Sequence, residues 1–202
     1  MAIKPNYAIK PTPELALRPS RALRPARLIA ALAVFGWCAA FELVSKSMLE
    51  EGENVSSELD SRVMEAIRDL SELGNVAAES RDFVTAREAF QEAFELIPEP
   101  RGIWEASTWL LAAIGDVEFL SHNFESARNV LQDCMHCVGA IGNPFIHLRL
   151  GQAQYELNNL SRAADELTRA YMGAGKEIFE SEDRKYFEFL KSVIKPPVSG
   201  SW

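Results

Sequence analysis

The chain has 202 residues and a net charge of −8, from 21 basic and 29 acidic side chains. An acidic surplus disfavours nucleic acid as a ligand, because phosphate binding requires a basic surface. The length allows one domain with extensions, and three cysteines are too few for a disulfide framework.

Residues 1–47 differ from the rest of the chain, with seven basic and two acidic side chains and five of the ten prolines. Four short segments echo one another: Ala2–Pro5, Ala8–Pro11, Ala16–Pro19 and Ala22–Pro25. Proline at this density forbids a regular helix or a central strand. We therefore predict a disordered basic segment, followed by a short apolar run from Leu28 to Phe41.

The apolar run allows three interpretations. Basic residues ahead of it and a small-residue site at Cys38–Ala40 suit a signal peptide. The protein would then be exported, or anchored in the inner membrane through residues 21–44, although a spanning helix needs about 20 apolar residues. A misassigned start codon is the second and favoured interpretation, because Met48 opens an ordinary cytoplasmic sequence. The third interpretation is a functional basic tail.

Residues 48–66 are predicted to extend the first helix of an array that covers residues 67–176. Gly74, Gly115 and Gly151 are each followed by an alanine at +12, a large apolar residue at +16 and a small residue at +19. These residues are Ala86, Phe90 and Ala93, then Ala127, Leu131 and Cys134, then Ala163, Leu167 and Ala170. A motif that recurs with fixed internal spacing predicts an array of helical hairpins, with each glycine packed against its alanine.

The connections follow the same pattern. Each hairpin turn is a polar stretch closed by an apolar residue, at Ser80–Phe83, His122–Phe124 and Asn158–Leu160. Amphipathic second helices are expected over 85–96, 126–137 and 161–171. The glycines lie 41 and 36 residues apart, which predicts enlarged linkers at 98–108 and 138–143.

A capping helix is expected at 177–195, because the last hairpin of an array needs a cover for its apolar face. Ser181 is the predicted N-cap, and Lys195-Pro196-Pro197 ends the helix ahead of a tail at 196–202.

These residues resemble the tetratricopeptide repeat (TPR) family of bacterial type. Leu70-x-x-Leu73-Gly74-x-x-Ala77, Ala86-x-x-x-Phe90, Ala93 and Pro98 follow its pattern of about 34 residues. The resemblance implies an all-α TPR-like array of about three repeats that binds protein partners and is not an enzyme. Consistent with this, we find no phosphate loop, no nucleophile elbow and no other catalytic motif, and we expect no cofactor.

In the family, the first helix of each pair lines a concave groove. The positions adjoining the predicted packing face give the partner-binding candidates Asn75, Trp109, Asp116, Phe119, Gln152 and Tyr155. Aromatic and amide side chains edged by acid suit a protein or peptide, and a basic one above all. Tyr155 is the strongest candidate, because its hydroxyl needs water or a partner.

Cys134 and Cys137 form a C-x-x-C pair, a spacing that can bind zinc or form a redox pair. A zinc site needs two more ligands, and Cys134 falls at a helix-packing position. We therefore predict structural cysteines and no metal.

Two functions remain open. The first is a cytoplasmic protein-binding module, in its more specific form a toxin-neutralising immunity protein. The second is a chaperone or adaptor for a secretion or envelope assembly, which is favoured if residues 28–44 are a real signal or anchor. The oligomeric state stays open.

Overall fold

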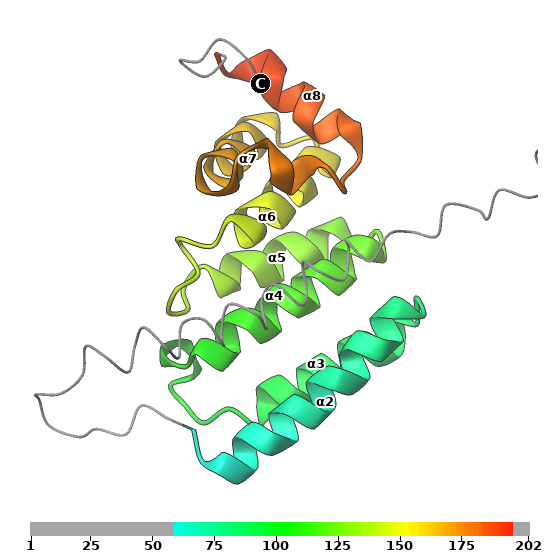
Figure 1. Cartoon of the computed structure of the whole chain (residues 1–202), viewed down its shortest axis with the longest axis vertical. Helices are drawn as coiled ribbons and strands as arrows, with labels where there is room; N and C mark the ends of the chain where they lie inside the picture. The colour runs from blue at the N-terminus through cyan, green and yellow to red at the C-terminus, as the bar shows by residue number, and fades with distance from the viewer. Residues whose placement is uncertain (1–58, 196–202) are drawn as a thin grey trace, which may run out of the picture.

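The structure is a computed structural model that describes residues 59–195, and in this range it contains seven α-helices and no strand (Figure 1). Six helices form three hairpins: α2 (Ser61–Glu79) with α3 (Phe83–Glu95), α4 (Glu105–Leu120) with α5 (Phe124–Cys134), and α6 (Pro144–Glu156) with α7 (Leu160–Ala174). Helix α8 (Arg184–Val193) follows at the C-terminal end, and two short 3₁₀ helices, η2 (Arg101–Ile103) and η3 (Lys176–Phe179), lie in the connections. The predicted all-α hairpin array with a C-terminal capping helix is confirmed.

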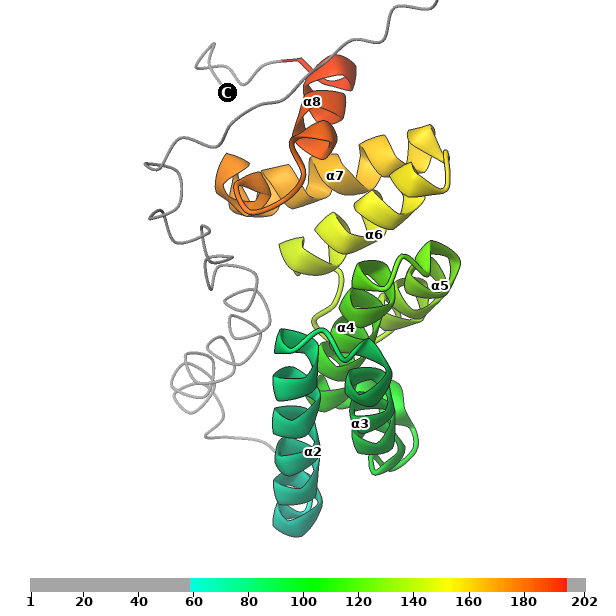
Figure 2. The same cartoon turned by 90° about the vertical axis from the view of Figure 1, so that its right-hand side faces the viewer.

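The hairpins stack in chain order. Helix α3 packs against α4, and α5 packs against α6, so that each hairpin covers one side of the next. Figures 1 and 2 show α2 and α4 in one layer, with α3 and α5 in a second layer behind them. The predictions for residues 1–58 and 196–202 lie outside the described residues.

The three hairpin turns share one geometry. Arg81, His122 and Asn158 adopt positive φ angles of 64°, 62° and 60° at the same place in each turn. The next residue in each turn donates its N–H to a carbonyl in the last turn of the first helix, over 2.9, 2.9 and 2.8 Å. This bond satisfies a carbonyl that the helix end leaves open. The repeat in the sequence is therefore a repeat in backbone conformation.

The repeated glycines make room for the large residue at +16. An added Cβ would lie 2.7 Å from the Phe90 ring at Gly74, 2.6 Å from Leu131 at Gly115 and 2.8 Å from Leu167 at Gly151. The atoms nearest to these Cβ positions belong to the large residues at +16, whereas the glycine–alanine contact itself stays a prediction. The alanines at +12 are fully buried nearby.

Several boundaries differ from those predicted. Helix α2 begins at Ser61, because the Asp60 carboxylate caps it by accepting a hydrogen bond from the Arg62 N–H, so the predicted extension is helical only from residue 61 among the described residues. Helix α7 continues to Ala174, and the predicted capping helix is divided into η3 and α8.

Helix α5 ends at Cys134 and not at Cys137, because the following chain turns towards the first linker. There the Val138 N–H donates to the Gly102 carbonyl (3.0 Å), and the Thr108 hydroxyl donates to the Val138 carbonyl (2.7 Å). Helix α8 is capped by Asp183 and not by Ser181, since the Asp183 carboxylate accepts a hydrogen bond from the Lys185 N–H.

Candidate partner-binding face

Four positions of each first helix lie on the side turned away from its own second helix. Counted from the repeated glycine they are −6, −2, +1 and +5, and we call them the inner face. The residues are Arg68, Glu72, Asn75 and Glu79 on α2; Trp109, Ala113, Asp116 and Leu120 on α4; and Phe145, Arg149, Gln152 and Glu156 on α6. The inner face is exposed on α2 except at half-buried Asn75, half-buried on α4, and buried at Arg149 and Gln152 on α6.

Residues 176–190, here called the C-terminal segment, cover the inner face of α6. The Glu182 carboxylate accepts hydrogen bonds from Arg149 Nη1 (2.7 Å) and Gln152 Nε2 (3.0 Å). The Tyr186 hydroxyl donates to Glu156 (2.5 Å), which also pairs with Lys185 Nζ (2.7 Å). The third inner face is therefore occupied by the chain itself.

Arg149 is the centre of this contact and is only 1% exposed. Its Nε donates to Asp116 of α4, and its Nη1 donates to the Gln152 side-chain oxygen (2.6 Å) as well as to Glu182. The guanidinium also lies over the Phe119 and Phe145 rings, at 4.9 and 5.5 Å from their centroids. Burial disfavours the charged form, but the two carboxylates outweigh it and raise the pKa of Arg149 above its ordinary value.

Four of the predicted partner-binding residues belong to this interior. Phe119 and Gln152 are buried, and Asp116 is paired with Arg149. Tyr155 packs on the Tyr186 and Phe189 rings, with centroids 5.5 and 5.0 Å apart. The reason is that the C-terminal segment folds back over α6, whereas the sequence pattern indicated only a cover for the last hairpin.

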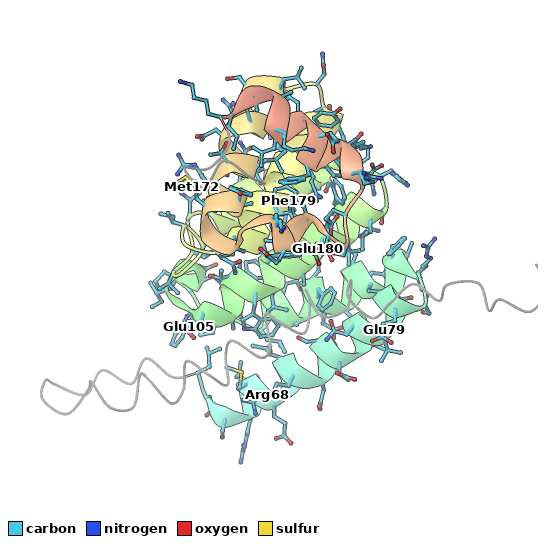
Figure 3. All side chains as sticks on the ribbon, turned by 45° about the horizontal axis from the view of Figure 1, so that its top comes forward. Arg68, Glu79, Glu105, Met172, Phe179 and Glu180 are labelled. Carbon is cyan, nitrogen blue, oxygen red and sulfur yellow. The ribbon has the colours of Figure 1, made fainter. Side chains whose placement is uncertain are left out.

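The other two predicted residues lie on the uncovered part of the inner face. Asn75 of α2 and Trp109 of α4 are half-buried, and Trp109 packs at the edge of the first core cluster. Charged residues accompany them on α2, where Figure 3 labels Arg68 and Glu79. The same view labels Phe179 and Glu180 in the C-terminal segment, beside the third hairpin.

Sequence reasoning missed Arg149 and Glu182. Arg149 occupies the −2 position that Glu72 and Ala113 hold in the earlier repeats, so its place on the inner face could have been inferred from the register. Glu182 carries no repeat signal, because it lies beyond the last hairpin. Only the folded chain brings it to α6.

A second buried contact joins α6, α7 and the second linker. His147 Nδ1 lies 2.6 Å from Glu166 Oε2, and its Nε2 lies 2.7 Å from the Ile141 carbonyl oxygen. An ionised Glu166 and the Ile141 carbonyl both accept hydrogen bonds, so the contact favours the charged imidazole, which can donate from both ring nitrogens. The hydrogen bond to Glu166 raises the pKa of His147, while burial and nearby Arg169 act to lower it.

This contact predicts a pH-dependent stability. In the unfolded chain the imidazole pKa is about 6.5. Because the folded pKa is higher, the stabilisation by His147 is complete below about pH 6.5 and is lost as the pH rises through the folded pKa. The difference in free energy of unfolding between the native chain and His147→Gln should therefore shrink from pH 6 to pH 9 in urea titrations. Exposed His136→Gln is the control, and a His147 difference that stays constant with pH would contradict the charged contact.

The two cysteines of the C-x-x-C pair differ in exposure, since Cys134 is buried and Cys137 is partly exposed. The Cys134 thiol is buried and donates to the Thr108 carbonyl over 3.3 Å, and burial raises its pKa to about 12. A thiol with such a pKa is neutral at pH 7 and is a poor metal ligand or nucleophile. In residues 59–195 no three His, Cys, Asp or Glu side chains gather as a metal ion would require. The absence of zinc stays a prediction.

None of the helices between residues 59 and 195 has the length and apolar character needed to cross a membrane.

No protein-family description matches the sequence, and neither does any curated protein. Among solved structures, the Arabidopsis OM64 TPR domain superposes with a TM-score of 0.53 at 20% sequence identity. The match covers 65% of this chain and 99% of that domain. At this identity the comparison shows the fold: the three hairpins form a TPR-like array.

Proposed function

We propose that the protein is a non-enzymatic scaffold that binds a protein partner on the inner face of α2 and α4. The observation that supports this proposal is the uneven cover of the inner face. The C-terminal segment occupies the third repeat, while the equivalent positions of the first two repeats stay partly or fully exposed. Arrays of helical hairpins typically present an extended surface to a partner.

The chemistry of the inner face favours a basic partner. On the exposed part of the inner face the carboxylates are Glu72 and Glu79 of α2, against one cation, Arg68. Asp116 of α4 is already paired with Arg149. This surplus of negative charge would steer and orient a cationic surface, and Trp109 supplies an aromatic contact within it.

The more specific form of the proposal is a toxin-neutralising immunity protein, for which a small acidic binder is suited. The alternative is a chaperone or adaptor for a secretion or envelope assembly. A real signal or anchor in residues 28–44 would favour that alternative, but these residues lie outside the described part of the chain. Identifying the captured partner by mass spectrometry separates the two, because one predicts a toxin and the other an assembly subunit.

Charge reversal on α2 tests the binding face. The pair Glu72→Lys and Glu79→Lys should weaken binding of the captured partner about tenfold, or roughly 1.4 kcal/mol, because it replaces attraction by repulsion. The loss should be larger at low salt, as measured by calorimetry or surface plasmon resonance. The matched control is Glu92→Lys with Glu95→Lys, which makes the same charge change on exposed positions of α3. Loss of binding in the α3 pair alone would place the partner on the second-helix side.

A further inference from the structure

Arg149 fills a slot between the first helices α4 and α6. The side chains of these two helices that outline the slot are Phe145 at −6 and Gln152 at +1 from the repeated glycine of α6, with Asp116 at +1 and Phe119 at +4 from that of α4. The guanidinium lies over both aromatic rings and donates hydrogen bonds to both polar side chains. This contact shows which chemical group two neighbouring first helices can hold between them.

The same positions one repeat earlier outline a second slot, which we call the α2–α4 slot. Its residues, in the same order, are Trp109, Asp116, Asn75 and Ala78. At −2, where the third hairpin has Arg149, the second hairpin has Ala113, whose side chain ends at Cβ. All five residues of the slot are half-buried. An aromatic ring and two polar side chains are therefore repeated, but the arginine that lies among them in the third hairpin is not.

We propose that the α2–α4 slot binds an arginine side chain of the protein partner, in the place that Arg149 takes one repeat later. This inference rests on the proposed function, because it specifies a contact on the same inner face. The guanidinium of the partner would lie over the Trp109 ring and donate to the Asp116 carboxylate and the Asn75 side-chain oxygen. Arginine suits the slot better than lysine, because a planar guanidinium can stack on a ring and donate in two directions at once.

Asp116 can take part in both slots. Arg149 Nε donates to its Oδ1, and a carboxylate has a second oxygen with further lone pairs. Arg149 is also shared with the Glu182 carboxylate, so it does not neutralise Asp116 completely. The Asp116 side chain is 14% exposed, which keeps it within reach of a group that enters from the inner face. A guanidinium in the α2–α4 slot would therefore meet a carboxylate that Arg149 already holds in position.

A substitution that fills the slot from within the chain tests the proposal in the full-length protein. Ala113→Arg introduces the residue that the third hairpin carries at −2, so its guanidinium should occupy the slot and exclude that of the partner. The matched control is Ala164→Arg on α7, at a half-buried position where the other two hairpins carry Arg87 and Arg128. We expect Ala113→Arg to weaken binding of the captured partner at least about tenfold without lowering the melting temperature. Ala164→Arg should change neither quantity.

Peptides of known structure test the chemistry of the slot directly. The probe is acetyl-Gly-Arg-Gly-amide, and its controls carry lysine, or citrulline, which has the shape of arginine without the charge. Each peptide is titrated into the isotope-labelled full chain and followed by NMR. We expect the arginine peptide to shift the signals of the Trp109 indole N–H and the Asn75 side-chain amide. Binding should be at least about tenfold weaker for the citrulline peptide, and for the arginine peptide with Ala113→Arg.

The proposal is overturned if Ala113→Arg binds the arginine peptide as the native chain does, or if the citrulline or lysine peptide binds as tightly. A melting temperature several degrees lower in Ala113→Arg would also overturn it, because the slot would then be filled already. Failure of the proposed function gives a different result. If the captured partner responds to Glu72→Lys with Glu79→Lys but not to Ala113→Arg, it uses the inner face without the slot. If it responds to neither, the inner face is not its binding surface.

Discussion

Replacing Arg149 by alanine is expected to lower the free energy of unfolding by roughly 3–5 kcal/mol, as for other buried ion pairs that lose one partner. The substitution removes the guanidinium that pairs with both Asp116 and Glu182 and leaves these two carboxylates in a desolvated site with Gln152. Urea denaturation followed by circular dichroism measures the loss. Arg169→Ala is the matched control, because its ion pair with Asp165 is exposed and contributes about 0–1 kcal/mol.

A second substitution separates the charge from the packing. Arg149→Met combined with Asp116→Asn and Glu182→Gln removes all three charges and keeps similar volumes. Neutralising a whole buried ion cluster is often far less harmful than breaking it, so this triple variant should recover roughly 2 kcal/mol or more relative to Arg149→Ala. A triple variant as unstable as the single one would show that the hydrogen-bond geometry, and not charge compensation, stabilises the contact. An Arg149→Ala protein as stable as Arg169→Ala would mean that the C-terminal segment does not cover α6.

The array itself could be predicted because its determinants are local and repeated. Gly74, Gly115 and Gly151 fix where two helices approach closely, and the polar turns fix where the chain reverses. Each repeat confirms the register of the others, so an error in one helix would conflict with the remaining two. The ends of the helices were less predictable from the sequence. The chain leaves α5 where the Val138 N–H donates to the Gly102 carbonyl of another linker, and a contact between two linkers carries no local sequence signal.

The candidate site was less predictable, because it depends on a segment that does not repeat. Helix periodicity assigned Phe119, Gln152 and Tyr155 to the correct helices, but of these three only Gln152 lies on the inner face, and Phe119 packs on Phe124 of α5. Periodicity could not show that Glu182 and Tyr186 would return to this part of the array and bury them. The inner-face positions of α2 and α4 stay accessible, because no equivalent segment covers these helices in the described part of the chain.

The second large effect is expected at Gly115, where substitution should destabilise the second hairpin. A Cβ there would lie 2.6 Å from Leu131 Cγ, and Leu131 is fully buried between α4 and α5. Gly115→Leu should lower the free energy of unfolding by roughly 3 kcal/mol or more, at or above the upper end for overpacked cores. The comparison is Gly142→Ala in the second linker, where nothing lies within 4 Å of the new Cβ. That control should change stability by less than about 0.5 kcal/mol.

A double-mutant cycle identifies the contact responsible. Gly115→Ala alone gains helix propensity of about 1 kcal/mol, so any net loss reports the steric conflict. Leu131→Ala alone removes a buried side chain and should cost about 2–5 kcal/mol. If the two residues compete for one space, the double variant should be more stable than the sum of the single effects by about 1 kcal/mol or more. Additive effects would show that the glycine is required by a neighbour other than Leu131, and the +16 residue would then not explain why glycine recurs in all three hairpins.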